Sequence, residues 1–231
     1  MIKLNLGCWK RNFPGWINID VIGYPHVHFQ RSVDDLSMFE DDSVDLVYAS
    51  HVLEYFTFEQ ARAAITEWCR VLKPDGEVRI AVPDFEALVK VYEKYKDPLM
   101  LRGSIFAIVD KVLEVEGKQV FHKMIYDEAL LTRLLEECGF TDVKRYDYKE
   151  FLGRFLPEGV IDRSASYLSA HDPKNQILVS LNLMAKKTGS FEATALKAQH
   201  LAEHLKDKVI NKAKRILRGE IGKRKKDLYK I

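Results

Sequence analysis

The chain has 231 residues, 47% of them hydrophobic, and a formal net charge of +2. It is long enough to bury a full core in one large domain, or in one domain with an appendage. No apolar run approaches the ~20 residues that cross a bilayer, and the N-terminal residues lack the basic region and cleavage site of a signal peptide. The three cysteines, Cys8, Cys69 and Cys138, are odd in number and far apart. This spacing argues against a disulfide framework or a structural zinc site and favours a reducing cytoplasm.

The charge is unevenly distributed along the chain. Residues 190–231 contain 12 Lys and Arg but 5 Asp and Glu, a balance of +7, whereas residues 1–189 contain 24 and 29, a balance of −5. We therefore predict two separate parts, a domain over 1–189 and a basic amphipathic helical tail over 190–231.

Four short segments near the N-terminus are predicted to be β-strands. They are near-continuous apolar runs: IKLNL (2–6), WINIDV (16–21), VDLVYAS (44–50) and EVRIAVP (77–83). Runs of this kind are typical of strands that are covered on both faces in a parallel sheet.

The connection between the first two strands is too short for a normal crossover. Only CWKRNFPGW separates Gly7 from Ile17, and it contains Pro14 and Gly15. A crossover between parallel strands usually needs a dozen or so residues and carries a helix. We therefore predict that the first helix of the fold is missing or vestigial.

Four segments are predicted to be helices. The first, FTFEQARAAITEWCRVL (56–72), has apolar residues at helical spacing and is stopped by the proline and glycine of KPDG. Residues 86–95 and 104–116 follow. The last helix, in YDEALLTRLLEECGF (126–140), has acids in its first turn and Gly139 as its C-cap.

Two further strands, DVKRYDY (142–148) and QILVSLNLMAK (176–186), close the domain with no helix-like segment between them. Strand–helix alternation that finishes in two adjacent strands predicts an α/β fold. The expected architecture is a doubly wound, mostly parallel Rossmann-like sheet with an antiparallel edge strand, followed by the C-terminal helical tail.

The order of these motifs resembles the class I S-adenosylmethionine-dependent methyltransferases, specifically a small bacterial subgroup of the methyltransferase type 11 kind. The segments that carry the resemblance lie between residues 2 and 187. They are LNLGC, PGWINID, DDSVDLVYASHVLEYF, VLKPDGEVRIAVPDF, FHKMIYDEALLTRLLEECGF and SLNLMAKK.

The resemblance implies that S-adenosylmethionine binds at the carboxyl edge of the sheet, where loops leave parallel strands. Asp20, at the end of the second strand, is placed to accept hydrogen bonds from two ribose hydroxyls. A pyrophosphate would need several amides at a helix N-terminus. The chain lacks the G-x-G-x-x-G pattern, so a nicotinamide dehydrogenase is a weaker alternative. The expected cofactor-binding residues are Asn5, Leu6, Gly7, Cys8, Trp9, Asp20, Val21, Ser32, Val33, Ala49 and Ser50, and no metal is expected.

Two positions depart from the pattern of the family. Trp9 stands where members usually have glycine, and Ser32 stands where they usually have an acid that contacts the adenine amino group. Trp9 could stack near the methionine arm, cover the pocket or block it. Asp34 or Asp35 could replace the missing acid.

His51 and His122 are the candidate catalytic residues. His51 follows the strand 44–50 at the carboxyl edge, where it could be the general base for an acceptor that is protonated at neutral pH; the alternative is that Ser50 and His51 cap the next helix. By resemblance, His122 belongs to a histidine–lysine pair that recurs in the subgroup and could fold over the pocket, and a surface position is the alternative. Glu54 could orient His51 or be a solvated helix acid.

Two other features bear on the acceptor. Asp84 could face it, although an N-cap for the helix that starts at Phe85 is favoured. Residues 149–175 are long for a loop in a compact domain and contain several aromatic residues and arginines, so we expect them to form part of the acceptor site. His171 in this segment is a weaker catalytic candidate.

The tail carries an apolar stripe at helical spacing among lysines and arginines. Its members are Leu201, Leu205, Val209, Ile216 and Leu217. The stripe could lie on an anionic membrane surface or pack on another subunit of a homo-oligomer. Nucleic acid is the weakest alternative, because no aromatic residue interleaves the basic residues before Tyr229.

Together these observations predict a cytoplasmic methyltransferase that moves a methyl group from S-adenosylmethionine to a small-molecule or sugar (glycan) acceptor. The expectation of a sugar acceptor comes from the resemblance alone. The alternative is a catalytically inactive methyltransferase-like scaffold that binds a partner or a membrane through its basic tail.

Overall fold

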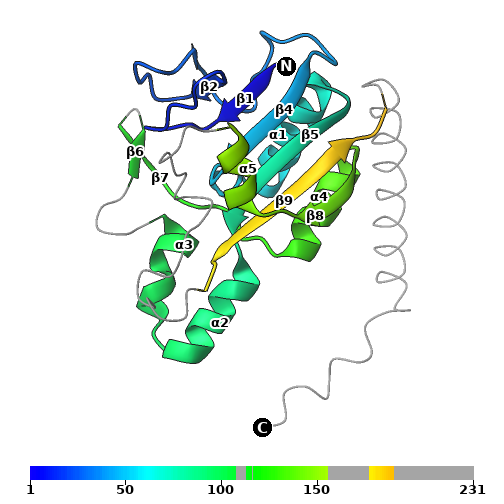
Figure 1. Cartoon of the computed structure of the whole chain (residues 1–231). Coiled ribbons are helices and arrows are strands. Elements are labelled where there is room, and N and C mark those ends of the chain that lie inside the picture. Colours follow the sequence, from blue (N-terminus) through cyan, green and yellow to red (C-terminus); the bar gives the residue numbers. More distant parts are fainter. Residues whose placement is uncertain (108–112, 116, 156–176, 190–231) are drawn as a thin grey trace, which may run out of the picture.

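The computed structural model describes residues 1–107, 113–115, 117–155 and 177–189 (Figure 1). Their strands form one seven-stranded sheet, in the order β3-β2-β1-β4-β5-β9-β8, and a separate hairpin of β6 and β7. The strands are β1 (Lys3–Leu6), β2 (Ile17–Asp20), β3 (Phe29–Gln30), β4 (Val44–Ser50), β5 (Leu72–Pro83), β6 (Leu113–Val115), β7 (Lys118–Val120), β8 (Phe140–Arg145) and β9 (Ser180–Lys187). The helices are η1 (Leu53–Tyr55), α1 (Phe58–Val71), α2 (Phe85–Tyr95), η2 (Pro98–Leu101), α3 (Arg102–Phe106), α4 (Glu128–Glu137) and α5 (Tyr148–Phe155).

The sheet is parallel except for the pairs made by β9, which runs antiparallel to both β5 and β8. The expected α/β fold with a mostly parallel sheet is therefore confirmed, and the antiparallel strand lies one position in from the edge. From β1 the chain proceeds through β2 to β3 at one edge, and from β4 it proceeds to β5 on the other side. The strand order thus reverses between β1 and β4, the place where open α/β sheets bind ligands.

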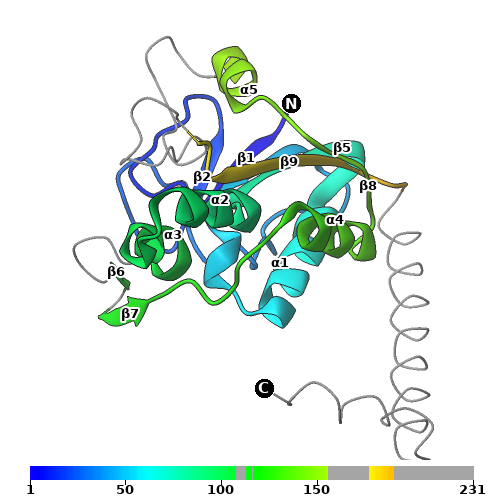
Figure 2. The ribbon, with the colours of Figure 1, turned by 90° about the horizontal axis from the view of Figure 1, so that it is seen from below.

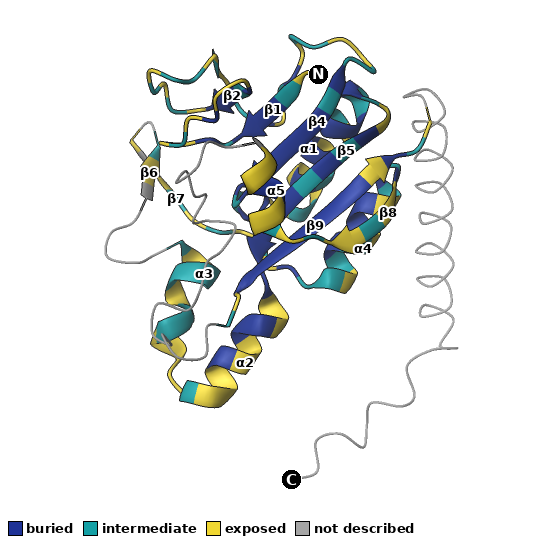
Figure 3. Cartoon of the chain, in the orientation of Figure 1, coloured by how far each residue is buried: buried dark blue, intermediate teal, exposed yellow. Residues whose placement is uncertain are grey.

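Helices cover the two faces of the sheet unequally. Figure 2 shows α1 and α4 on one face and α5 on the other. Helix α1 begins with a capping box between Thr57 and Gln60 and buries residues at helical spacing, Trp68 among them. The long central strands are buried along nearly their whole length (Figure 3), as the apolar runs predicted.

Residues 7–16, all of which are described, contain no helix, so the predicted loss of the first helix is confirmed. Aromatic side chains cover the sheet in its place. Phe13 stacks on Tyr48 of β4 with ring centroids 5.7 Å apart, and Trp16 meets Phe151 of α5 edge-on at 6.3 Å. All four rings are at most 3% exposed. Their large buried area substitutes for a helix on this face.

The predicted helix over 104–116 is wrong. Helix α3 ends at Phe106, and residues 113–115 form a strand that pairs antiparallel with Lys118–Val120. In LEVEGKQV, apolar and polar residues alternate before Gly117, whose φ of +74° suits a tight hairpin turn. The alternation before the turn and the glycine within it favour a hairpin over a helix here.

The predicted absence of a helix after β8 is also wrong, because α5 occupies the start of the segment 149–175. The Asp147 side chain accepts hydrogen bonds from the amides of Lys149 (2.8 Å) and Glu150 (3.3 Å), as an N-cap does. The rest of the segment from residue 156, with His171, lies outside the described residues. So does the tail, 190–231.

No helix among the described residues is long and apolar enough to cross a membrane. The three cysteines are buried free thiols.

Removing one ring from the aromatic cluster should destabilise the fold as much as removing a contact between a core helix and the sheet. We expect Phe13→Ala to lower the free energy of unfolding by about 3 kcal/mol, because a fully buried phenylalanine is replaced by a cavity. Urea unfolding followed by circular dichroism measures this change. Phe85→Ala, at a ring that is 39% exposed, is the control and should cost less than about 1 kcal/mol. Equal effects of the two substitutions would contradict the role assigned to Phe13.

Candidate active site

The glycine at the first strand end is required by the protein's own packing. Gly7 has a φ of +65°, and its amide donates to the carbonyl of Ile19 at 2.8 Å. A Cβ at this position would lie 2.1 Å from Cγ2 of Val52, which follows β4. In the structure the Val52 side chain takes up that space and joins the two loops at the reversal of strand order.

Asp20 is held at the end of β2 by two backbone amides. Its Oδ2 accepts from Trp9 N at 2.7 Å, and its Oδ1 accepts from Ile22 N at 2.8 Å. The side chain is only 6% exposed. A carboxylate has about four lone-pair sites, so each oxygen keeps one for a further donor. The carboxylate is thus preorganised, and it fits a pair of vicinal hydroxyls such as those of a ribose.

Trp9 adopts the left-handed backbone conformation, φ +45°, in which glycine is normally found. Its amide is bound by Asp20, and its carbonyl lies 2.8 Å from Nε2 of His26. The indole is 43% exposed, and the ammonium of Lys10 lies 5.1 Å from a ring centroid. The indole is therefore partly accessible to solvent and does not belong to the buried core. With Val21, which is 36% exposed, it gives Asp20 an accessible apolar border.

The residues around Ser32, the position of the missing acid, form hydrogen bonds and an ion pair with one another. Ser32 donates its hydroxyl to Asp34, while Asp35 binds Arg31 at 2.6 Å and the Ser37 hydroxyl at 2.7 Å. These hydrogen bonds, those from Ser37 first, lower the pKa of Asp35. Both carboxylates expected to replace the missing acid thus stabilise the local turn. Next to them, the buried Val33 accepts from the Trp68 indole at 2.8 Å through its carbonyl.

The other expected cofactor-binding residues have buried side chains. They are Asn5, Leu6, Cys8, Ala49 and Ser50, each at most 4% exposed. The Asn5 amide donates to the Asn18 side chain at 2.9 Å, and burial, with Asp20 adding to it, raises the pKa of the Cys8 thiol to about 12. At these positions only the backbone is placed to contact a ligand at the edge.

His51 follows β4 directly and has a left-handed φ of +54°. Its amide still continues the sheet by donating to Ala81 O at 2.8 Å. A residue other than glycine is strained in this conformation, and strained residues cluster at functional sites. The imidazole lies 2.9 Å from Glu54 Oε1 through Nδ1 and 2.9 Å from Ser180 Oγ through Nε2. The ring is therefore held from two sides, which goes beyond a helix-capping role.

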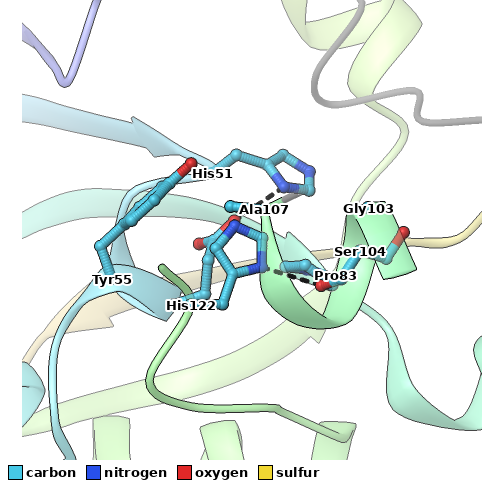
Figure 4. A pocket seen from close by; sticks show the side chains of 8 residues that line it. His51, Tyr55, Pro83, Gly103, Ser104, Ala107 and His122 are labelled. Atoms are coloured by element: carbon cyan, nitrogen blue, oxygen red, sulfur yellow. Dashed lines mark hydrogen bonds and ion pairs between the residues drawn. The ribbon is translucent and has the colours of Figure 1, made fainter. Parts of the chain in front are cut away.

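Glu54 is completely buried, so the solvated-acid alternative is wrong. It lies between the two histidines: Oε1 is 2.9 Å from His51 Nδ1 and 3.9 Å from His122 Nε2. Figure 4 shows the rings of His51 and His122 in the same pocket. In the sequence, the only sign of this arrangement is an acid three residues after a histidine within an apolar run.

His122 reaches the site because its segment runs along η1. The amides of Lys123 and Met124 donate to the carbonyl of Glu54, at 2.7 and 3.2 Å. The His122 side chain is 7% exposed, its Nδ1 lies 2.8 Å from Ser104 O, and its ring meets Tyr55 edge-on at 4.7 Å. The surface alternative for His122 is therefore excluded, and both predicted histidines lie in one pocket.

The pocket between these groups has a volume of about 90 Å³. His51, Glu54, Tyr55 and His122 line one part of it, and the residues Pro83, Gly103, Ser104 and Ala107 line the rest. Asp84, just beyond Pro83, does not line the pocket. Its carboxylate accepts from the amides of Glu86 and Ala87 and caps α2, as the sequence favoured.

Comparison with known families finds a match over part of the chain. Residues 18–80 match the family model described as a methyltransferase domain. This region begins in β2 with Asp20 and ends in β5, so it includes His51 and Glu54. No curated protein matches the chain.

Three solved structures illustrate the similarity of fold. A Burkholderia thailandensis 1,6-didemethyltoxoflavin-N1-methyltransferase, bound to 1,6-didemethyltoxoflavin and S-adenosylhomocysteine, is 15% identical, covering 81% of this chain and 71% of its own (TM-score 0.44). A SAM-dependent methyltransferase from Archaeoglobus fulgidus is 18% identical over 80% and 85% (TM-score 0.46), and one from Methanosarcina mazei is 16% identical over 81% and 92% (TM-score 0.46). Similarities at this level carry no argument about substrates or residue roles.

His122 should make stability depend on pH. Burial lowers the pKa of its imidazole below the usual value, and the neighbouring Glu54 opposes this only in part. Below about pH 6.5 the unfolded chain therefore binds a proton that the folded chain binds less readily. Stability should be complete above that pH and should fall as the pH drops toward the folded-state pKa.

Urea unfolding at pH 7.5 and 5.5 measures this dependence. His122→Asn keeps a donor for the Ser104 carbonyl but does not titrate, so the stability lost between the two pH values should be smaller in this variant. His26→Gln, near β2, should retain the full loss. An unchanged loss in His122→Asn would contradict the assignment.

Proposed function

We propose that this chain, whose residues 18–80 match a methyltransferase domain, transfers a methyl group from S-adenosylmethionine to a small-molecule or sugar acceptor that enters the pocket of His51, Glu54 and His122. The observation that carries the proposal is the buried Glu54 carboxylate between two histidines, next to the reversal of strand order. The proposal of a sugar as the acceptor rests on the resemblance of the sequence alone.

The residues at the ends of β1 and β2 fit the nucleoside part of S-adenosylmethionine. Asp20 keeps an acceptor site on each oxygen, and Trp9 and Val21 border it with accessible apolar surface. When bound, S-adenosylmethionine supplies a methyl group on a sulfonium, which an electron pair of the acceptor displaces in line. The chain's part in this step is to hold the acceptor in line and to take up its proton.

The hydrogen bonds favour His122 as the histidine that receives that proton. A carboxylate accepts, so His51 carries hydrogen on Nδ1, and its Nε2 lies within hydrogen-bond distance of Ser180. A backbone carbonyl also accepts, so His122 carries hydrogen on Nδ1, and the lone pair of its Nε2 faces Glu54. His122 Nε2 is therefore the proton acceptor for the substrate. Glu54 stabilises the imidazolium that forms, and His51 orients Glu54.

Binding of the product S-adenosylhomocysteine tests the cofactor site directly. Isothermal titration calorimetry should show binding to the full chain, weakened about 10- to 100-fold in Asp20→Ala, since hydrogen bonds to a charged group contribute about 1.5–3 kcal/mol. Asp20→Asn should fall between the two, because it keeps one acceptor oxygen. Asp34→Ala is the control and should bind as the wild type does.

Failure of the wild type to bind in the millimolar range would remove the methyltransferase function. The inactive scaffold would then be favoured. Weakening in Asp34→Ala equal to that in Asp20→Ala would instead assign the ribose contact to the wrong carboxylate.

A further inference from the structure

The pocket presents hydrogen-bond acceptors to whatever enters it. Glu54 is 0% exposed; its Oε1 is occupied by His51, and its Oε2 has no hydrogen-bond partner among the described residues. His122 Nε2 lies 3.9 Å from Oε1 of the same carboxylate, too far for a hydrogen bond. The carboxylate and this ring nitrogen thus lie close together without a donor between them.

The charge of the pocket also favours a ligand that supplies hydrogen-bond donors. None of the described residues that line it is a lysine or an arginine. A buried carboxylate that no cation pairs with costs several kcal/mol, and a buried acceptor without a donor adds about 1–3 kcal/mol. A ligand that brings both hydrogen-bond donors and a positive charge removes both penalties.

From these observations we infer that the pocket recognises an amino group of the acceptor substrate, which enters as an ammonium and donates to the Glu54 carboxylate and to His122 Nε2. An ammonium has three donors and no acceptor, so it matches this arrangement. The Tyr55 ring also lines the pocket, and aromatic rings attract cations. A phosphate or carboxylate would be repelled by Glu54, and a hydroxyl would supply a donor without the charge.

The size of the pocket limits how much of the substrate enters. Its volume of about 90 Å³ is small beside the roughly 300–1,000 Å³ of typical small-molecule sites. An amino group with its adjoining carbon fits this space, while the body of the substrate stays outside. An amino sugar or another small amine satisfies this requirement.

The amino group can also be the methyl acceptor, which deepens the proposed function and rests on it. One proton passes from the ammonium to His122 Nε2, which leaves a neutral amine with a lone pair and an imidazolium paired with Glu54. The nitrogen then forms a bond to the methyl carbon while the carbon–sulfur bond breaks, with its electron pair going to sulfur. The methylated ammonium leaves, and the imidazolium releases its proton to water.

Fragment binding to the full chain tests the specificity without a turnover assay. Propylamine, 1-propanol and propionate at pH 7.5 are titrated while the Cε1–H signals of the histidines are followed by NMR. Propylamine should shift the His51 and His122 signals with an affinity at least tenfold higher than 1-propanol, and propionate should shift neither. Equal affinities for amine and alcohol, or no shift with propylamine up to 100 mM, would overturn the inference.

Variants separate recognition by charge from general effects on the fold. Glu54→Gln should abolish the preference for the amine, whereas Glu86→Gln, on the exposed surface of α2, should keep it. If Glu54→Gln does not fold, judged by thermal unfolding, His122→Asn is used and should lower propylamine affinity at least fivefold. Retention of the full amine preference in the folded variant would also overturn the inference.

S-adenosylhomocysteine calorimetry on the same variants distinguishes this inference from the proposed function. Glu54→Gln should still bind S-adenosylhomocysteine, because Asp20 lies on a different strand end. If the wild type binds propylamine but not S-adenosylhomocysteine, the methyltransferase function fails and amine recognition stands. If it binds S-adenosylhomocysteine but prefers the alcohol, only the amine inference fails.

Discussion

The buried carboxylate of Glu54 joins three parts of the chain that are remote in sequence. Its side chain binds His51 at the end of β4, and its carbonyl accepts the amides of Lys123 and Met124. The same segment continues to Tyr126, which bridges to Asp84 after β5 and accepts from the Phe85 amide. Because an uncompensated buried charge is costly, these contacts have to form together, and together they bring His122 to the pocket.

Asp20 and Glu54 show two ways in which the loops after the strands can hold a carboxylate. Asp20 accepts hydrogen bonds from the amides of Trp9 and Ile22, and each of its oxygens keeps acceptor capacity. Glu54 has one oxygen bound by an imidazole and the other without a partner among the described residues. The first environment suits neutral hydroxyl donors, and the second suits a cation.

The loop after β1 shows how the fold tolerates an unusual connection. Without the first helix, Gly7 is retained because Val52 packs against it, and Phe13 and Trp16 cover the sheet with Phe151 of α5. The guanidinium of Arg79 on β5 lies 4.2 Å from the Phe151 ring centroid and extends the cluster across the sheet. The carboxyl edge of the sheet is thus supported by side-chain packing, in a place where a crossover between parallel strands usually carries a helix.

The sequence by itself determined the features that depend on local periodicity. The apolar runs predicted the central strands, the spacing in 56–72 predicted α1, and Pro14 with Gly15 excluded a helix in the first connection. Misassignments occurred where short segments satisfy two patterns, as in 104–116, or where a single cap such as Asp147 starts a helix. The type and order of the central elements were therefore predictable, while α5 and the β6–β7 hairpin were not.

The candidate site divides in the same way. His51 and Asp20 could be found because each ends a strand, and parallel strands bring their carboxyl ends to one edge. For Glu54 the sequence left open whether it orients His51 or is a solvated helix acid, because it does not show that the segment around Lys123 covers this residue and excludes water. Only the tertiary structure decided that this acid is buried, that it lies between two histidines, and that one of its oxygens has no partner among the described residues, since burial and pairing arise from contacts between distant segments.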